Sequence, residues 1–464
     1  MSQPRQCTNR RGWSRPVLAA AILIAFSTHG AGQVGSGPGT ATGVSPDRPR
    51  LRVGTQPSTT IRVNTNAAGV EADGKTDVST VSADGRFVAY SSVASNIVGG
   101  DTLGLRDVFV YDTLTGQADL ASGTPGGQPG NGVSGSELAL SASGHLVAFD
   151  SWASDLVPGD TNGQLDIFVR DLRTGSTERV SVDSAGAEAD GPSAGVSMSA
   201  DGRWITFSSW ASNLVPGDVN GVQDVFLHDR QTGETRRISE TAEGVGGEGE
   251  SHSPAISSNG MFVAYSTRAN NLVSEPLGTY HYIFVHDLQT ESTWHASVDS
   301  LGEFAHGDCD TRPSITPDGR YVAFATDAYN LAVPDLNWVS DIFVHDRLTG
   351  DTTRVSVSST GAEANGGSIL PTMSDDGRYV AYMSSASNLV AGDTNGQPDV
   401  FLLDRNSGKV RCVSLDKLGG PANGPSTTPT LSPNGLRLVF GSDASDLIAL
   451  DANQLRDVFL CTVP

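Results

Sequence analysis

Short apolar runs alternate with turn signals along most of the chain. The runs are about four to six residues long and rich in Val, Ile and Phe, which is typical of β-strands and too short for helices. Between Met198 and Ser239, Asp201-Gly202 and Thr232-Gly233 each separate two such runs. Because glycine accepts the positive φ of a tight hairpin, both dipeptides predict antiparallel hairpins.

This pattern recurs seven times. Each copy contains Asp-(Val/Ile)-Phe-(Val/Leu) or a close variant, and its phenylalanine follows the previous one after 58 or 59 residues, at Phe109, Phe168, Phe226, Phe284, Phe343, Phe401 and Phe459. Seven copies of about 58 residues occupy residues 59–464 and leave no room for a separate catalytic domain. A repeat that cannot bury its own apolar face requires stacked neighbours in a ring or an array.

Each repeat is predicted to supply four antiparallel strands, the content of a β-propeller blade. The seventh repeat ends soon after Phe459 without a fourth strand, whereas Thr60–Asn64 resembles the fourth strand Thr353–Ser356 of another repeat. An N-terminal strand that completes the last blade would leave no exposed sheet edge. We therefore predict an all-β fold, a seven-bladed β-propeller of four-stranded antiparallel blades closed in this way, with blades numbered one to seven along the chain.

In this topology the connections between blades and the loops between second and third strands emerge on one face, called here the long-loop face. The two tight hairpins of each blade emerge on the other face. Carboxylates recur in the long loops, for example Glu71 and Asp73, or Glu188 and Asp190. The sequence therefore predicts an acidic long-loop face.

The repeats resemble the PD40 or WD40-like repeats of the TolB-type propeller family, whose blades carry a Ser-x-Asp-Gly hairpin followed by a Val-Phe-Val type of strand. The resemblance covers residues 59–464, but the usual repeat of that family has about 40 residues, so the long loop between second and third strands is additional. Membership would imply a periplasmic or extracellular interaction scaffold. Propellers host many functions, so this implication is an analogy.

The N-terminus has the composition of an export signal. Basic residues precede an apolar run from Val17 to Phe26, and small residues follow it. The run is shorter than the roughly 20 residues of a membrane-spanning helix, so residues 1–31 are interpreted as a cleaved signal peptide rather than an anchor. Residues 32–58, rich in Gly, Pro and Ser, are interpreted as a flexible linker. We thus expect an exported monomer without a transmembrane span.

The chain carries a formal net charge of −22. This charge disfavours nucleic acid and anionic membranes as partners and favours cations or basic partners, although acidity can also serve solubility alone. Three cysteines lie in the repeats, Cys309, Cys412 and Cys461. They are too few for a disulfide framework and allow one pair and one free thiol.

Five blades contain the motif Asp-x-Asn-x-x-x-Asp ahead of the third strand. The copies are Asp160, Asn162 and Asp166; Asp218, Asn220 and Asp224; Asp335, Asn337 and Asp341; Asp393, Asn395 and Asp399; and Asp451, Asn453 and Asp457. Alternate oxygen ligands in a glycine-containing loop suit Ca²⁺. The alternative is that Asn-Gly forms a turn while the last Asp holds the loop. Neither interpretation requires a cofactor. Calcium binding and a turn held by side chains both remain open as explanations of the motif.

Blade four and the connection to blade five break the repeat. Tyr282 replaces the Asp that precedes the repeated phenylalanine in the other blades. Several residues of unusual type fall in loops of the long-loop face: His252, Glu275, His281, His306, Cys309 and Asp310. Together with Asp308 they could form a partner or ligand patch, or bind a transition metal. Their spacings match no zinc motif.

The primary functional hypothesis is an exported, non-enzymatic propeller that binds a protein or cell-envelope component through its acidic long-loop face. The rival is a propeller enzyme, a lyase or hydrolase of glycans or lactones, with a site in the central funnel near blades four and five. Unrepeated polar residues converging in that funnel would favour the rival. No nucleophile elbow or metalloprotease motif is present.

Overall fold

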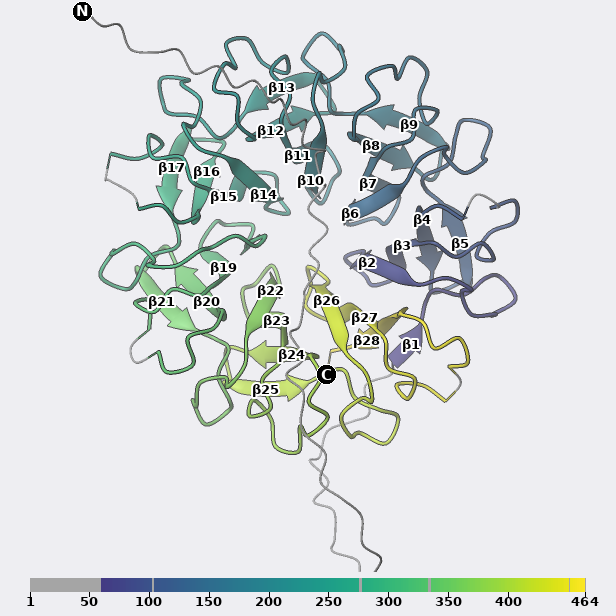
Figure 1. Ribbon diagram of the computed structural model, residues 1–464, viewed down its shortest axis with the longest axis vertical. Coiled ribbons are helices and arrows are strands. Elements are labelled where there is room, and N and C mark those ends of the chain that lie inside the picture. The colour runs from purple at the N-terminus through teal and green to yellow at the C-terminus, as the bar shows by residue number, and fades with distance from the viewer. Residues whose placement is uncertain (1–59, 102–103, 275–277, 333–334, 450, 464) are drawn as a thin grey trace, which may run out of the picture. The chain divides into compact units, whose positions relative to one another are not determined.

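The structure is a computed structural model that describes residues 60–101, 104–274, 278–332, 335–449 and 451–463. The signal peptide and linker predicted for residues 1–58 lie outside these ranges. All regular structure within them is β-strand, in seven four-stranded antiparallel sheets (Figure 1). Among these residues no helix is long and apolar enough to cross a membrane.

The strands of the first four blades follow one another along the chain. Blade one contains β2 (Thr76–Val81), β3 (Phe87–Ser92), β4 (Asp107–Asp112) and β5 (Gln117–Leu120); blade two β6 (Ser134–Leu140), β7 (Leu146–Ser151), β8 (Asp166–Asp171) and β9 (Ser176–Arg179); blade three β10 (Ser193–Met198), β11 (Trp204–Ser209), β12 (Asp224–Asp229) and β13 (Glu234–Arg237); and blade four β14 (Ser251–Ile256), β15 (Phe262–Thr267), β16 (Tyr282–Asp287) and β17 (Ser292–His295).

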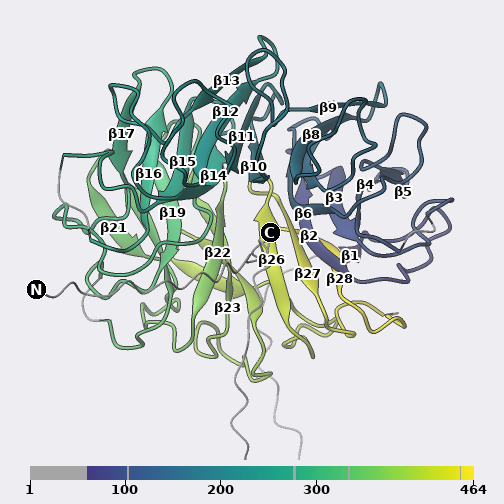
Figure 2. The same cartoon turned by 45° about the horizontal axis from the view of Figure 1, so that its top comes forward.

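The last three blades continue this order until the final strand. Blade five contains β18 (Ser314–Ile315), β19 (Tyr321–Thr326), β20 (Asp341–Asp346) and β21 (Asp351–Arg354); blade six β22 (Ser368–Met373), β23 (Tyr379–Ser384), β24 (Asp399–Asp404) and β25 (Lys409–Cys412); and blade seven β26 (Ser426–Leu431), β27 (Arg437–Ser442), β28 (Asp457–Thr462) and β1 (Thr60–Arg62). The first strand of each blade, such as β10, β22 and β26, stands nearest the centre of the ring (Figure 2).

The repeated phenylalanine explains how the blades stack. It lies on the third strand and pairs across the sheet with an aromatic residue of the second strand, as Phe226 does with Phe207 at a ring-centroid distance of 5.9 Å. Both are fully buried, and they pack against Ile167 and Val169 of the preceding blade. Each apolar cluster thus joins two neighbouring blades, so the core is a circle of interfaces rather than one centre.

The ring closes as predicted. Strand β1 pairs antiparallel with β28, with Arg62 opposite Phe459. The buried Asn64 then fixes the junction, because its Nδ2 donates to Asp457 Oδ1 at 2.6 Å and its Oδ1 accepts from the Val458 backbone N–H at 3.0 Å. In blade three a serine, Ser239, makes the same two contacts with Asp224 and Val225.

The first hairpins of neighbouring blades are linked on the face opposite the long loops. The backbone N–H of Ala83 donates to Ala142 O, that of Ala142 to Ala200 O, and that of Ala200 to Ser258 O. The backbone N–H of Asp375 donates in the same way to Pro433 O. Pro317 and Pro433 occupy this position in blades five and seven and have no N–H to donate to the next hairpin.

Replacing Asn64 with alanine tests the closure. The variant would leave the backbone N–H of Val458 without its partner and remove one of the two donors to Asp457 Oδ1, so we expect a loss of about 1–3 kcal/mol in the free energy of unfolding. Ser239→Ala, which removes the same contacts inside blade three, should cost a similar amount. Denaturant titration of both variants would contradict closure by β1 if only Ser239→Ala were destabilised.

Candidate functional site

The Asp-x-Asn loops hold themselves together by side-chain contacts. In blade two, Asn162 Oδ1 accepts from the Gln164 backbone N–H at 2.8 Å, and its Nδ2 donates to Asp166 Oδ2 at 2.8 Å. The other oxygen of Asp166 accepts from Ser181 Oγ at 2.5 Å. Asn162 therefore makes the turn that one of the two interpretations predicted. The last Asp is held by side chains rather than by backbone N–H groups.

An arginine guanidinium occupies the space between the carboxylates of most copies. Arg179 Nη1 of the fourth strand lies 3.2 Å from Asp160 Oδ1, 3.5 Å from Asp166 Oδ2 and 2.9 Å from Glu188 Oε2. The equivalent residues elsewhere are Arg62, Arg237 and Arg354, each with contacts to the local carboxylates. In these four blades calcium would have to share its ligands with a cation that is already bound to them.

Blade six has neither this arginine nor the glutamate. Cys412 stands opposite Phe401, where the other motif-bearing blades have arginine, and Pro421 stands where Glu188 lies in blade two. Burial and the nearby Asp399 raise the pKa of Asp393 to about 6. If calcium binds at any Asp-x-Asn loop, blade six offers carboxylates without a competing guanidinium, so the calcium hypothesis is narrowed to this copy.

Two histidines and two aspartates of the predicted patch meet at the junction of blades four and five. His252 Nε2 lies 3.1 Å from Asp310 Oδ1, and His281 Nδ1 lies 3.2 Å from Asp308 Oδ1 and 3.8 Å from Asp310 Oδ1. His252 belongs to β14 and His281 precedes β16, while both aspartates precede β18. We call these four residues the His–Asp cluster. It lies where strands begin on the long-loop face.

Charges around the His–Asp cluster are dominated by carboxylates. Glu250 Oε1 lies 3.4 Å from His281 Nε2, and Arg268 Nη1 lies 3.3 Å from the same oxygen. A hydrogen bond from His252 lowers the pKa of Asp310. That carboxyl is therefore ionised over the neutral pH range and able to accept hydrogen bonds or a cation.

Cys309 of the predicted patch contributes its side chain to the core rather than to this cluster. Cys309 is fully buried in the apolar cluster between blades four and five, and burial raises the pKa of its thiol to about 12. The other six blades have a buried serine or threonine at the position of Cys309. This position therefore belongs to the core of every blade. Glu275 lies outside the described residues. All three cysteines of the propeller are free thiols.

Blades two and five each have a one-residue insertion near the start of the inner strand, and these insertions carry a second group of polar side chains. The spacing from the start of the inner segment to the Ser or Thr of the first hairpin is seven residues in blade two, from Ser134 to Ser141, and seven in blade five, from Cys309 to Thr316, against six in the other blades. The inserted segments carry Glu137 and Arg312, whose side chains form an ion pair although they are 175 residues apart. Blades two and five are not neighbours, so this pair spans the centre of the ring.

An exposed aromatic row on blade five was not foreseen from the sequence. His306 Nδ1 lies 3.0 Å from Tyr329 Oη, and the Tyr329 ring lies 6.1 Å from that of Trp338. We call these three residues the aromatic row. Tyr329 replaces the serine or asparagine of the other blades, and Trp338 stands where four of them have glycine. Alignment of the repeats at this register would have revealed both.

The backbone of Trp338 has φ of 55°, close to the 64° of Gly163 at the same position in blade two. A bulky residue in this left-handed region costs of order 1–2 kcal/mol. Trp338 is 72% exposed, so burial of its indole does not offset this free-energy cost. Gln454 of blade seven is in the same position with the same φ of 55°.

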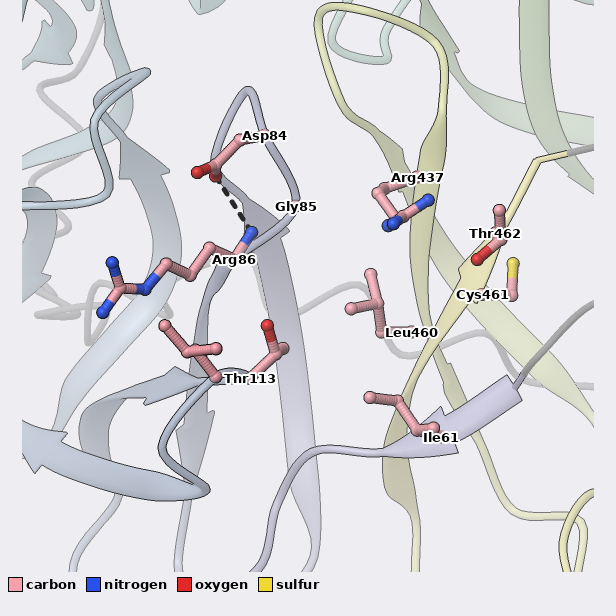
Figure 3. A pocket seen from close by; sticks show the side chains of 10 residues that line it. Ile61, Asp84, Gly85, Arg86, Thr113, Arg437, Leu460, Cys461 and Thr462 are labelled. Atoms are coloured by element: carbon pink, nitrogen blue, oxygen red, sulfur yellow. Dashed lines mark hydrogen bonds between the residues drawn. The ribbon is translucent and has the colours of Figure 1, made fainter.

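Two surface hollows lie away from the His–Asp cluster and the aromatic row. One, of about 420 Å³, lies between blades seven and one and is lined by Ile61, Leu460 and Arg437 on one side and the Asp84-Gly85-Arg86 hairpin on the other (Figure 3). The second, of about 480 Å³, lies between the first hairpins of blades one, six and seven. Both belong to the hairpin face, opposite the long loops.

Comparisons with known proteins support the fold. No protein-family model matches the sequence, and no curated protein does. Among solved structures, the chain is similar to an oligogalacturonate lyase from Vibrio parahaemolyticus (TM-score 0.50, 13% identity, 87% of this chain and 93% of that chain). It is also similar to the β-propeller domain of the Trilobed protease from Pyrococcus furiosus (0.51, 11%, 84% and 93%).

TolB from Acinetobacter baumannii matches with a TM-score of 0.40, 15% identity and coverage of 86% of this chain and 81% of that chain. That score is too low to carry an argument. For the lyase and the protease domain, identities this low support a shared fold and say nothing about activity. The propeller implied by the sequence resemblance is thus confirmed. The assignment to PD40 repeats stays a prediction.

The blade-six carboxylates give a test at neutral pH. The folded-state pKa of Asp393 is about 6 and the unfolded one about 4, so the folded state loses stability as pH rises between these values. Asp393→Asn should therefore stabilise the protein at pH 7.5, raising the melting temperature, and should stabilise it by only about half as much in free energy at pH 5. If blade six binds calcium, added Ca²⁺ should stabilise the wild type more than the variant. Equal responses to both pH and calcium would contradict this account of the loop.

Proposed function

We propose that the protein is an exported, non-enzymatic binding scaffold that docks a protein of the cell envelope on the long-loop face of blade five. The observation that carries this proposal is the aromatic row. Trp338 is held in a strained backbone conformation and exposed, an arrangement that costs stability and brings no packing in return. Strain retained at an exposed position is typical of functional sites.

The chemistry of the row suits a protein interface. Tryptophan and tyrosine dominate the binding energy of protein interfaces because their rings bury a large area while losing little conformational entropy. Leu336 is 74% exposed beside Trp338 in the same loop and extends the apolar surface. The row has the composition of an interface centre rather than of an ordinary loop.

Acidic residues surround the row and indicate the charge of the partner. Glu303 and Asp327 are exposed close in sequence to His306 and Tyr329. An acidic rim around an aromatic centre favours a partner with a basic surface and accelerates its association at low salt. This agrees with the acidic composition of the whole chain. Export rests on the signal peptide predicted for residues 1–31.

Trp338→Gly separates binding from stability. Glycine restores the residue that four other blades have at this register and relieves the left-handed strain, so we expect the free energy of unfolding to stay equal or to rise by up to about 1 kcal/mol. Loss of an aromatic side chain that becomes buried on binding should weaken partner binding by at least about 2 kcal/mol, or roughly 30-fold. Binding would be measured by capture of purified envelope proteins on the immobilised full chain, quantified for each captured protein.

Gln454→Gly is the matched control, since it makes the same backbone change on blade seven. We expect a similar effect on stability and no effect on capture. A captured protein that binds wild type and Trp338→Gly equally would contradict docking at the row. A lower melting temperature for Trp338→Gly than for Gln454→Gly would contradict the strain argument.

A funnel enzyme is the second candidate, and the Glu137–Arg312 pair is the observation that favours it. The Glu137 side chain is 38% exposed. Desolvation by the surrounding protein nevertheless raises its pKa; Arg312 opposes this shift and Asp150 reinforces it. A carboxyl with a raised pKa beside a guanidinium is a plausible acid or base for an anionic substrate. A solved structure of similar fold is an oligogalacturonate lyase, which makes oligogalacturonate a sensible first probe.

Turnover assays decide between the candidates. If the funnel is catalytic, the wild type should shorten oligogalacturonate or another anionic oligosaccharide, and Glu137→Gln should lower kcat by about 100-fold or more. Glu243→Gln on an exposed loop is the control and should leave kcat unchanged. Absence of turnover with a panel of anionic and neutral oligosaccharides and lactones, or full activity in Glu137→Gln, would exclude this site.

A further inference from the structure

The donor atoms of the His–Asp cluster have the separations of ligands around one metal ion. A tetrahedral ion with bonds of about 2.0–2.2 Å places neighbouring ligand atoms about 3.3–3.6 Å apart. The distance from His252 Nε2 to Asp310 Oδ1 is 3.1 Å, and that from His281 Nδ1 to Asp310 Oδ1 is 3.8 Å. His252, His281 and Asp310 offer one atom each, all within 4.8 Å of one another.

From this geometry we infer that His252 Nε2, His281 Nδ1 and Asp310 bind a divalent transition metal that joins blades four and five, while Asp308, which accepts from the His281 backbone N–H at 2.9 Å, holds His281 in place. Imidazole together with carboxylate suits Zn²⁺ and its first-row neighbours better than Ca²⁺, which prefers oxygen ligands alone. Asp308 and Asp310 flank Cys309, whose burial fixes the backbone between them.

The second nitrogen of His281 supports this assignment. His281 is only 4% exposed, and its Nε2 makes no hydrogen bond within the described residues. Glu250 Oε1 lies 3.4 Å from that nitrogen. With Nδ1 on a metal, Nε2 carries the proton and faces a carboxylate, which is the arrangement that orients metal-binding histidines in proteins.

The local charge also favours a divalent cation. Asp308, Asp310 and Glu250 contribute three negative charges, and Arg268 is the cation that contacts two of them. With neutral histidines the group has a net charge of about −2, because three carboxylates are offset by one guanidinium. A divalent ion would neutralise it.

The position explains why a metal would be useful to this blade. Strand β18 has two residues, whereas the first strands of the other blades have six or seven. The inner edge of blade five therefore pairs with β19 over a short register, Ser314 with Ala323 and Ile315 with Val322. A metal held by His252 and Asp310 would fasten the segment before β18 to blade four.

A second group of carboxylates does not carry the same inference. Asp335, Asp341 and Glu363 of blade five also lie close together. The guanidinium of Arg354 contacts Asp341 and Glu363 there, so their charge is already compensated. The metal inference is also independent of the proposed function, because it uses no residue of the aromatic row.

Zinc titration of the full chain tests the inference. After treatment with chelator, the wild type should bind one Zn²⁺ by calorimetry and gain melting temperature, since the ion binds only the folded state. Bound Co²⁺ should show the visible absorption of a tetrahedral site. His252→Asn and Asp310→Asn should each weaken zinc binding by at least about tenfold and Glu250→Gln by about tenfold.

His306→Ala and Trp338→Gly are controls and should bind zinc as the wild type does, which keeps this test separate from that of partner docking. His252 is partly exposed, so its variant is expected to fold even where replacement of the buried His281 prevents folding. No binding of stoichiometric zinc by the wild type would overturn the inference. So would unchanged zinc affinity in both His252→Asn and Asp310→Asn.

Discussion

No blade of this protein can cover its own apolar faces. A twisted sheet of four strands has two apolar sides, and here each side is covered by the neighbouring blade, as Phe226 and Phe207 are by Ile167 and Val169. The arrangement is stable only if every blade has two neighbours. Ring closure by β1 and the alternation of hairpins and long loops between the two faces follow from this one constraint.

Much of the fold could be predicted because repetition multiplies a weak local signal. A single Asp-Gly between apolar runs predicts little, but seven hairpins in register with seven phenylalanines define blade number and strand order. The missing fourth strand after Phe459 and the strand-like Thr60–Asn64 then predict the closure. The loop chemistry was less accessible, since Arg179 lies on a different strand from Asp160 and nothing local shows that they meet.

The candidate sites were predicted only in part, for a related reason. The break at blade four directed attention to His252 and His281, which the structure brings together with Asp310. The pairing of Glu137 with Arg312 depends on the full circle and was invisible in the sequence. Trp338 was missed because the motif containing it was considered only as a calcium loop or as a turn, whereas comparison of its register with Gly163 would have shown the departure.

The pairing of Arg62 with Asp457 joins residues 395 positions apart in the chain. Strand β1 is among the first parts of the propeller to be synthesised, yet its partner β28 is among the last. Until then β1 has no sheet to join, and the interface between blades seven and one is incomplete. Contacts of such long range slow folding and prolong the exposure of unpaired edges. The same strand that protects the finished ring thus makes its assembly dependent on the last residues of the propeller.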